Sequence, residues 1–374
     1  MDAGESCLKL IFAVDALAPQ LSGIGRYTWE LARRMGQAPE IEQVRYYRNG
    51  QGISDPAALL EGAYRKPVFR LPRWTREMYW QRACRGRVFH TPNYLLPGCA
   101  ENGVITVHDL SVFRFPETHP VARVRQFEKS FRKSLDMAVH LITDSEVTRR
   151  EVIEYFGWPD DRVSAIHLGV TQEYAPRSAG QVTPVLQRYG LSHHAYSLCV
   201  STIEPRKKID SLLAAYEQLP KALRAAYPLV LIGGQGWQSE ALHVRIQAAQ
   251  QEGWLHYLGF VAEADLPVLY AGASLFVYPS IYEGFGLPVA EAMASGVPVI
   301  ASSLSTLPEI SAGAALLIDP DDIDAMANVI ALALQDETWR QAHIAAGLKV
   351  AAGYSWETCF RKTCDVYSAV DMRK

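Results

Sequence analysis

The sequence has few cysteines, no long apolar run and no strong excess of charge of either sign. No apolar stretch approaches the roughly 20 residues that a transmembrane helix needs, and the segment at residues 8–14 is interrupted by Lys9 and lacks a signal-peptide layout. We therefore expect a cytoplasmic protein. A formal net charge of −3 and the absence of a recognised nucleic-acid-binding motif argue against a nucleic-acid partner.

The six cysteines form no CxxC pair and no His/Cys cluster with the spacing of a zinc site, so we expect them to be reduced and mostly structural. The acidic run at residues 319–322 leads directly into an apolar helical pattern, which favours a turn and a helix N-cap over a metal site. These observations predict a protein that requires no metal and no cofactor.

Strand and helix patterns alternate along the whole chain, which indicates an α/β fold with parallel sheets. At 374 residues the chain is long enough for two domains with separate cores, facing each other across a cleft. A polar interval at residues 172–183 is the expected linker between domains at residues 1–177 and 182–355. The expected strands are residues 8–14, 104–107, 140–143 and 164–166 in the first domain, and residues 197–200, 229–232, 255–258, 275–278, 297–301 and 315–318 in the second.

Two glutamates with seven residues between them, Glu283 and Glu291, form the most informative pattern in the chain. A buried strand at residues 275–278 is followed by two glycines that open a tight turn and by Pro288, which suits the first position of a helix. Glu283 is therefore expected in a loop at the carboxyl end of a strand, and Glu291 in the first turn of the helix. Open α/β sheets bind ligands at this edge, where carboxylates accept hydrogen bonds from hydroxyls and backbone amides bind phosphate.

Other loops at strand ends fit the same edge. A loop with Gly23 and Gly25 fits either an anion-binding site or a packing turn, and it lacks the third glycine and the acid of a dinucleotide-binding motif. His108 ends a strand, where it is either a hydrogen-bonded core residue or a functional group facing a ligand. Asp144 or Ser145, after another strand, is expected to be a plain helix N-cap.

Three cations, Arg206, Lys207 and Lys208, stand at the start of an expected helix. Because the helix dipole favours anions there, either a bound diphosphate offsets these cations or the run is a solvated basic turn. Segments around Gly234 and at residues 259–261 follow two other strands, either as loops that hold a nucleobase or as simple turns.

Arginines alternate with aromatic residues between Arg65 and Arg87. This segment fits contact with an anionic membrane surface or a lipid-linked diphosphate acceptor, because arginines attract anionic groups and Trp and Tyr suit the interface. The alternative is a solvated amphipathic helix. The candidates for acceptor or membrane contact are Arg73, Trp74, Arg76, Trp80 and Arg82.

The segments SGIGRYTWEL, VHDLSVFRFPETHP, TDSEVTRREV, STIEPRKK and YEGFGLPVAEAMASGVPVIAS, in this order, resemble the retaining glycosyltransferases of family 4. The resemblance covers almost the whole chain. It implies the GT-B fold, with two Rossmann-like domains and a C-terminal helix, residues 356–374, that returns to the N-terminal domain. The N-terminal domain would bind the acceptor, and the C-terminal domain would bind the nucleotide-sugar donor.

The resemblance implies a role for each matching residue. Glu283 would contact hydroxyls of the donor sugar, Glu291 would hold the ribose, and His108 would lie near the reacting carbon. Arg206 and Lys207 would neutralise the diphosphate leaving group, and more depends on them here because many relatives carry Gly-Arg where this chain has Ser201-Thr202. The catalytic candidates are His108, Glu283, Arg206 and Lys207, and the donor-binding candidates are Gly23, Gly25, Ser201, Thr202, Arg206, Lys207, Gly234, Phe260, Val261, Glu283, Gly284, Phe285, Gly286, Leu287 and Glu291.

The resemblance further implies a metal-independent transferase that retains the anomeric configuration. We predict transfer of a hexose, with mannose from GDP-mannose as the first choice, to a lipid-linked or oligosaccharide acceptor. The expected setting is bacterial surface-polysaccharide biosynthesis, such as O-antigen, capsule or exopolysaccharide, at the cytoplasmic face of the inner membrane. The alternatives are transfer of glucose, galactose or another sugar from a UDP-sugar, a sugar-nucleotide epimerase of the same fold, and a non-catalytic sugar-nucleotide-binding protein.

Overall fold

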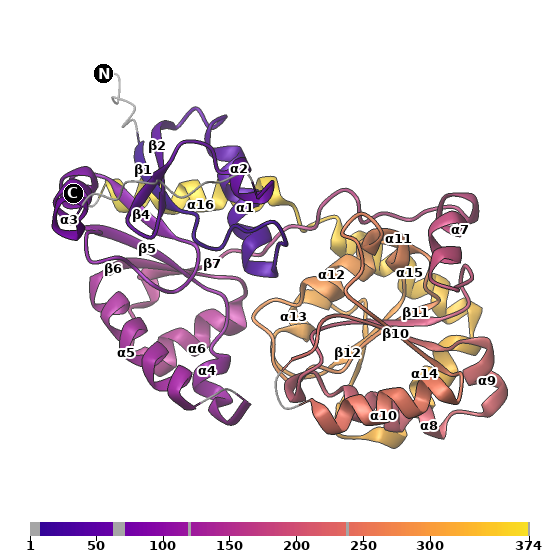
Figure 1. Ribbon diagram of the computed structural model, residues 1–374. Helices are drawn as coiled ribbons and strands as arrows, with labels where there is room; N and C mark the ends of the chain where they lie inside the picture. The colour runs from indigo at the N-terminus through magenta and orange to yellow at the C-terminus, as the bar shows by residue number, and fades with distance from the viewer. Residues whose placement is uncertain (1–7, 63–71, 119–120, 237–238, 373–374) are drawn as a thin grey trace. The chain divides into compact units, whose positions relative to one another are not determined.

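The computed structural model describes residues 8–62, 72–118, 121–236 and 239–372 (Figure 1). The chain forms two compact units. Unit 1 comprises residues 1–114, 121–169 and 356–374, and unit 2 comprises residues 115–120 and 170–355. Each unit is built around a sheet of its own.

Unit 1 contains a seven-stranded sheet in the order β3-β2-β1-β4-β5-β6-β7. Neighbouring strands are parallel except β2 and β3, which pair in antiparallel fashion. The strands are β1 (Leu8–Ala13), β2 (Ile41–Arg48), β3 (Gln51–Ile53), β4 (Val88–Thr91), β5 (Asn102–Val107), β6 (Ala138–Thr143) and β7 (Val163–Ala165). The helices are α1 (Gly23–Met35), α2 (Ala57–Leu60), α3 (Arg73–Cys84), α4 (Ser111–Arg114), α5 (Val121–Met137), α6 (Glu146–Phe156) and α16 (Trp356–Asp371).

Unit 2 contains a six-stranded sheet in the order β10-β9-β8-β11-β12-β13, with all neighbours parallel. The strands are β8 (Ser197–Val200), β9 (Leu229–Ile232), β10 (Leu255–Gly259), β11 (Leu275–Tyr278), β12 (Val299–Ser302) and β13 (Leu316–Ile318). The helices are α7 (Ala179–Arg188), α8 (Ile209–Gln218), α9 (Lys221–Ala226), α10 (Glu240–Gln251), α11 (Leu266–Ala271), α12 (Leu287–Ala294), α13 (Leu307–Ser311), α14 (Ile323–Gln335) and α15 (Glu337–Ala351).

Both sheets have a topological switch point, where the strand order changes direction. It falls between β1 and β4 in unit 1 and between β8 and β11 in unit 2. The loops that follow these neighbouring strands lead away in opposite directions, and open parallel sheets bind ligands in the crevice that this leaves. Unit 2 has the strand order of a Rossmann fold. Unit 1 has the same arrangement around its switch point, where β2 and β1 lie on one side and β4 and β5 lie on the other. The predicted class of two Rossmann-like α/β domains is confirmed.

The C-terminal helix α16 packs on unit 1, as predicted. Figure 1 shows this helix in yellow among the indigo elements of unit 1, and it contacts α1, β1, β4, β5 and β6. The hydroxyl of Tyr367 lies 2.6 Å from Nδ1 of the buried His90, and the rings of Trp356 and Tyr27 are in contact. Gly169 permits close approach at the start of this helix, since a Cβ at Gly169 would lie 2.1 Å from the backbone nitrogen of Trp356.

Three strands of unit 1, β2, β3 and β4, are not among those expected from the sequence. The residues of β2 are all exposed or half-buried, so its polar sequence IEQVRYYR shows no clear apolar alternation. The strands β3 and β4 have only three and four residues. The remaining strands coincide with the expected ones apart from shifts at their ends.

The chain crosses from unit 1 to unit 2 after Gly169, earlier than the linker expected at residues 172–183. The residues after the crossing pack on unit 2: the backbone N–H of Val170 donates to the carbonyl of Tyr354, and the ring of Tyr174 contacts that of Tyr270. Ser178 and Gln181 then form a capping box at the start of α7. The polar composition of this interval therefore reflects a surface segment and a helix start rather than an independent linker.

Candidate active site

The candidate site of unit 2 lies at the switch point between β8 and β11. The loop after β8 contains a single turn of 3-10 helix, Pro205–Lys207, and the loop after β11 carries Glu283 and leads into α12. The two loops are joined by a hydrogen bond from the backbone N–H of Ile281 to the carbonyl of Arg206 at 3.0 Å. The structure thus brings together the two motifs that the sequence analysis singled out.

A cluster of charged side chains connects these loops. Nζ of Lys207 pairs with Oε1 of Glu283 and donates to the hydroxyl of Tyr278 at 3.1 Å, and this hydroxyl donates to the same carboxylate oxygen at 2.8 Å. The guanidinium of Arg206 lies 3.8 Å from Oε2 of Glu283 and donates to the carboxylate of Glu204 at 2.8 Å. We call Glu204, Arg206, Lys207, Tyr278 and Glu283 the charge cluster.

The electrostatics of the charge cluster keep Glu283 ionised. Burial alone would raise the pKa of this carboxyl, but the charges of Lys207 and Arg206 lower the pKa to about 2. Burial and the neighbouring Glu283 carboxylate raise the pKa of Tyr278 well above its usual value, so its phenol stays protonated. Glu283 is therefore a permanent hydrogen-bond acceptor near neutral pH, as a group that binds sugar hydroxyls needs to be.

Burial excludes the solvated-turn interpretation for two of the three cations. Lys207 is only 8% exposed, and the side chain of Arg206 is similarly enclosed. Lys208 differs, since its Nζ lies 2.6 Å from a carboxylate oxygen of the largely exposed Asp321. Asp322, from the same acidic run, caps α14 by accepting from the N–H of Ala325, as predicted.

The start of α12 lies beside the charge cluster. Gly286 adopts a φ of 103°, a backbone conformation that favours glycine, and a Cβ there would lie 2.7 Å from the end of the Leu307 side chain. The helix begins at Leu287, and Glu291 lies beyond its first turn rather than within it as predicted, because the helix contains Pro288 at its second position. Glu291 is 8% exposed.

The segment that precedes α12 presents its backbone while its aromatic side chain is buried. The ring of Phe285 packs against that of Tyr354, with 5.4 Å between centroids. Within the part of the chain that the structure describes, the backbone amides of Gly286 and Leu287 have no hydrogen-bond partner. Gly284 lies between Glu283 and these residues, so the predicted group at residues 283–287 forms one continuous lining.

The other donor-binding candidates of unit 2 lie on the loops after β8, β9 and β10. The N–H of Ile203, which follows Ser201 and Thr202, donates to the carbonyl of Gly234 at 3.0 Å. Phe260, which precedes Val261, is 84% exposed, and its ring lies against Gly234, where a Cβ would be 2.6 Å away. These three loops form one edge that continues to the charge cluster through the loop after β8.

Two glycine candidates lie in unit 1, in the first turn of α1. Ser22 caps this helix by accepting from the N–H of Gly25 at 3.2 Å, and a Cβ at Gly25 would lie 3.1 Å from the carbonyl oxygen of Ala16. The packing interpretation therefore fits Gly25. Gly23 has open space around it, with no atom within 4 Å of a Cβ at its position.

His108 is buried in unit 1, with both ring nitrogens bonded to protein groups. Nδ1 lies 2.7 Å from a carboxylate oxygen of Asp144, and Nε2 lies 2.8 Å from the carbonyl oxygen of Pro92. A carbonyl only accepts, so Nε2 carries a proton and a second proton is shared between Nδ1 and Asp144. Burial favours the neutral ring, but the Asp144 carboxylate and the Pro92 carbonyl outweigh it and raise the pKa of His108.

This arrangement matches the core-residue interpretation of His108, and contact with the donor sugar stays a prediction. Both nitrogens are taken, so binding a sugar through the ring would require His108 to give up Asp144 or Pro92. The arrangement also separates the two N-cap candidates. Ser145 caps α6 by accepting from the N–H of Thr148 at 3.2 Å, whereas the side chain of Asp144 bonds to His108 instead.

The acceptor or membrane candidates lie on α3. Trp74 is 63% exposed and Arg82 is also exposed, Arg76 is half-buried, and Trp80 is buried at 4%. The side chain of Arg73 and the candidate segment at residues 65–71 fall outside the described residues. Burial removes Trp80 from any contact with a membrane surface.

Two features are absent from the described residues. No helix among them is long and apolar enough to cross a membrane. They also contain no group of three or more His, Cys, Asp and Glu side chains arranged to hold a metal ion.

Sequence reasoning missed three contributors to the site. From the sequence, Tyr278 is expected only as the last residue of a strand, and Glu204 has no assigned role. Ser305 donates to the carbonyl of Glu283 at 2.8 Å and accepts from its N–H, with a φ of 58° that fixes its loop. Glu204 had a usable signal, since a carboxylate directly before two buried cations is a natural partner for them.

The sequence of this chain is similar to those of known proteins. Residues 190–350 match the family model described as glycosyl transferases group 1. An O-antigen chain mannosyltransferase B of Escherichia coli is 41% identical over 96% of this chain and 99% of its own length. A serotype-specific mannosyltransferase of Escherichia coli is 34% identical over 62% of this chain and 29% of its own length.

Solved structures share the fold over almost the full length. A crystal structure of an Anabaena protein in complex with UDP and glucose has a TM-score of 0.74 at 18% identity, covering 96% of this chain and 99% of that one. A glycosyltransferase involved in lipopolysaccharide biosynthesis has a TM-score of 0.74 at 16% identity, with the same coverage. The predicted GT-B fold class is thereby confirmed.

Replacing Glu283 by Gln tests the electrostatics of the charge cluster. A carboxyl whose pKa is about 2 when folded and 4.5 when unfolded contributes stability that is present above the unfolded value and is lost as the pH falls toward the folded value. This contribution is on the order of 3 kcal/mol. We expect the free energy of unfolding, measured by urea denaturation between about pH 5 and pH 3, to fall more steeply for the wild type than for Glu283→Gln. The exposed Glu154→Gln is the control, and parallel curves for the wild type and Glu283→Gln would contradict the prediction.

Proposed function

The chain belongs to the glycosyl transferases group 1 family, and from this premise we propose that it transfers mannose from GDP-mannose to a growing O-antigen saccharide. Membership in the family makes the protein a glycosyltransferase. The choice of mannose and of O-antigen is supported by the relative that is 41% identical over nearly its whole length. The choice of GDP rests on the mannose assignment and is a proposal.

The charge cluster is the observation that carries the proposal. It places an ionised carboxylate and two buried cations at the switch point, beside amides of Gly286 and Leu287 that have no partner among the described residues. Glu283 suits the hydroxyls of a sugar, and Arg206, Lys207 and the amides suit the oxygens of a diphosphate. A nucleoside diphosphate sugar contains both kinds of group.

The resting pairs of the two cations also suit a transfer reaction. Without a donor, Glu204 and Glu283 satisfy Arg206 and Lys207, so no buried charge lacks a partner. A diphosphate that binds here shares these cations, and its charge grows as the bond to the sugar breaks. Cations that are already held in place stabilise that growing charge at little reorganisation cost.

We propose that this neutralisation is done by Arg206 and Lys207 without a metal ion, and that the configuration at the sugar carbon is retained. In that reaction the departing phosphate accepts the proton of the acceptor hydroxyl on the same face of the sugar. Glu283 then holds the sugar and is not assigned as a nucleophile. The prior pairing of its carboxylate with Lys207 supports a positioning role.

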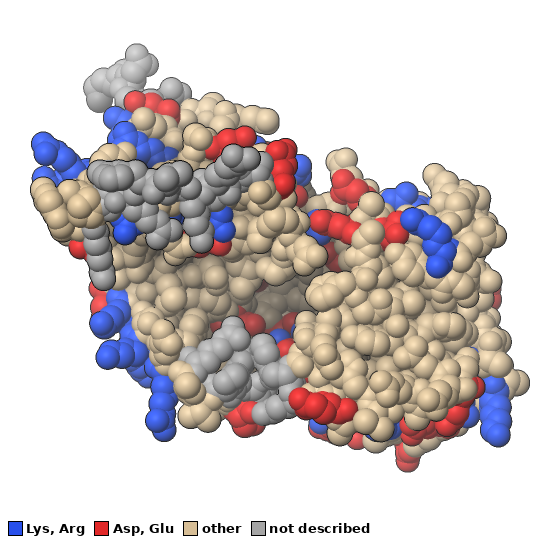
Figure 2. Space-filling model, in the orientation of Figure 1, with Lys and Arg blue, Asp and Glu red and all other residues tan. Residues whose placement is uncertain are grey.

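We also propose that α3 and α5 place unit 1 on an anionic membrane. Trp74, Met78 and Tyr79 on α3 are each more than half exposed, and Arg82 and Arg85 follow them. The exposed cations of α5 are Arg125, Lys129, Arg132 and Lys133. Figure 2 shows Lys and Arg in blue along the edge of unit 1 that carries these two helices. Aromatic and Met side chains that enter the interface, next to cations that attract anionic headgroups, support this partner.

The proposed reaction is tested by incubating the purified protein with radiolabelled GDP-mannose and a lipid-linked mannose oligosaccharide. We expect one mannose to be added in the α-configuration, seen by NMR of the product, with no loss of activity in EDTA. Transfer from UDP-glucose or UDP-galactose but not GDP-mannose would overturn the donor assignment. An isomerised sugar nucleotide formed without acceptor would indicate an epimerase, and donor binding without any product would indicate a binding protein.

Replacing Lys207 by Met tests the role of the charge cluster in the chemical step. Loss of one positioned charge that stabilises the leaving group costs about 3 kcal/mol, so we expect kcat to fall on the order of a hundredfold. Lys208→Met is the matched control, because the neighbouring Nζ pairs with the exposed Asp321 instead. An equal fall of kcat in the two variants, or a wild-type kcat in Lys207→Met, would show that Lys207 does not stabilise the leaving group.

The membrane proposal is tested by co-sedimentation with vesicles of phosphatidylcholine, with and without phosphatidylglycerol. Each basic residue near an anionic surface is worth about 1 kcal/mol, so the double variant Arg82→Glu/Arg85→Glu should bind anionic vesicles at least tenfold more weakly. Trp74→Ser/Met78→Ser should weaken binding at high salt, where the electrostatic part is screened. Lys221→Glu/Lys349→Glu, on unit 2, is the charge-matched control, and equal binding by all variants would refute the proposal.

A further inference from the structure

The switch point of unit 1 is hollowed. A cavity of about 320 Å³ lies between the loop after β1 and the loop after β4, where Asp15, Ala16, Pro92 and Asn93 line it. Pro92 is also the residue whose carbonyl accepts from His108. This hollow therefore occupies in unit 1 the place that the charge cluster occupies in unit 2, at the carboxyl ends of the strands that flank the switch point.

A second hollow adjoins the first. It has a volume of about 620 Å³, within the range of ligand-binding pockets, and shares Tyr47, Asn49 and Pro97 with the first hollow. Its other side is formed by α3, through Arg76, Glu77, Trp80 and Gln81. Because the lining residues are shared, the two hollows form one continuous depression that runs from the β4 loop to α3. We call this depression the unit 1 groove.

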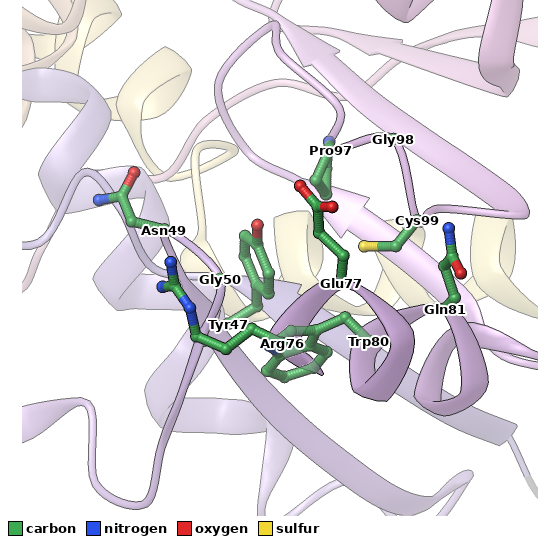
Figure 3. Close-up of a pocket in the computed structure, with 10 residues that line it drawn as sticks. All are labelled: Tyr47, Asn49, Gly50, Arg76, Glu77, Trp80, Gln81, Pro97, Gly98 and Cys99. Atoms are coloured by element: carbon green, nitrogen blue, oxygen red, sulfur yellow. The ribbon is translucent and has the colours of Figure 1, made fainter. Parts of the chain in front are cut away.

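The polar groups of the unit 1 groove are varied and include more acidic than basic side chains. Figure 3 shows the carboxylate of Glu77 and the hydroxyl of Tyr47 turned toward the space below the loop at Pro97 and Gly98. Asn49 and Gln81 add side-chain amides, and Arg76 adds a guanidinium whose buried Nε has no hydrogen-bond partner among the described residues. With Asp15 from the first hollow, the groove has two carboxylates and one guanidinium, so the lining offers donors and acceptors but no excess of positive charge for an anion.

The aromatic groups of the unit 1 groove are fixed in place. The rings of Tyr47 and Trp80 meet edge to face, with 4.9 Å between their centroids and 82° between their planes. Tyr47 also contacts Phe89 of β4 in the same manner. Rigid aromatic rings beside amides and a carboxylate suit a ligand with an apolar carbon face and many hydroxyl groups. This description fits a sugar ring better than a lipid chain or a phosphate.

We propose that the unit 1 groove binds uncharged sugar units of the acceptor. The inference rests on the proposed function for the identity of the sugar, and on the lining of the groove for the class of ligand. It separates the candidates on α3 into two groups. Arg76 serves the saccharide with its newly identified neighbours Glu77 and Gln81, while Trp74 and Arg82 serve the membrane.

The proposal excludes two other ligands by chemistry. The carboxylate of Glu77 opposes a diphosphate at the site where Arg76 would attract it, so the lipid-linked diphosphate is assigned to a place outside the groove. A lipid chain would bury the amides of Asn49 and Gln81 without partners, which costs about 1–3 kcal/mol for each unsatisfied group. A saccharide satisfies these groups and the guanidinium of Arg76 together.

The test uses the full-length protein and a linear mannotriose with a methyl aglycone, which has neither lipid nor phosphate. Gln81→Ala and Glu77→Gln are compared with Gln37→Ala and Glu154→Gln, exposed positions of the same types in unit 1 outside the groove. We expect mannotriose to bind the wild type in saturation-transfer NMR. Loss of one or two hydrogen bonds to a ligand should raise the acceptor KM about tenfold in each groove variant. The donor KM, the slow hydrolysis of donor without acceptor, and kcat at saturating acceptor should stay unchanged, as should every parameter of the controls.

The outcomes separate this inference from the proposed function. If mannose transfer occurs and the groove variants keep a wild-type acceptor KM, the groove inference is wrong while the function stands. If mannose transfer fails but mannotriose or another neutral oligosaccharide binds the wild type and not the variants, the groove inference stands while the donor assignment falls. If the variants lose only a diphosphate-containing acceptor and free oligosaccharides do not bind, the groove accepts the phosphate and the inference is overturned.

Discussion

The ion pair between Lys207 and Glu283 is the interaction on which the site of unit 2 depends. Lys207 comes from the loop after β8 and Glu283 from the loop after β11, so the pair bridges the switch point of the sheet. Lys207 is buried and the side chain of Glu283 is only 12% exposed, and a buried charge that loses its partner costs several kcal/mol. The two loops therefore keep each other in place. The same pairing sets the pKa of Glu283, orients Tyr278 and holds the cations beside the start of α12.

Unit 1 uses a related device for a different purpose. His108 and Asp144 pair at the ends of the neighbouring strands β5 and β6, and a chain of buried hydrogen bonds runs from Tyr27 through Thr106 and His90 to Tyr367 of α16. Each side chain from Tyr27 to Tyr367 is bonded to the next, so this chain adds specificity, whereas Oδ1 of Asp144 has no hydrogen-bond partner among the described residues. The network fixes the C-terminal helix on unit 1, whereas the cluster in unit 2 keeps cations ready for a ligand. Polar groups at strand ends therefore fix a helix in unit 1 and position charged groups for a ligand in unit 2.

The sequence predicts most of unit 2 because its strands are apolar on both faces and end in loops with strong turn residues. The same reasoning misses β2, whose residues are all exposed or half-buried at one side of the sheet, so that its pairing with β1 is not visible in its own composition. It places Arg206, Lys207 and Glu283 at one edge, but it does not predict that they pair with one another, because contacts between loops distant in sequence depend on the register of the whole sheet. For the same reason it does not reveal that Asp144 bonds to His108 instead of capping α6.

Polar, apolar and basic residues are interspersed along α3, but residues at i, i+4 spacing share one environment. Trp80 and Cys84 form a buried row, Glu77 and Gln81 line the unit 1 groove, and Trp74, Met78 and Arg82 face away from the core. A helix with three environments has no single apolar face, which is why the segment fits neither a simple core helix nor a simple surface helix. A lipid-linked saccharide acceptor contains a sugar part, which suits the polar row that lines the groove, and a lipid part, which suits the row that faces away from the core. Because these rows are adjacent on one rigid helix, a lipid anchored at the outward row would leave its saccharide at the mouth of the groove.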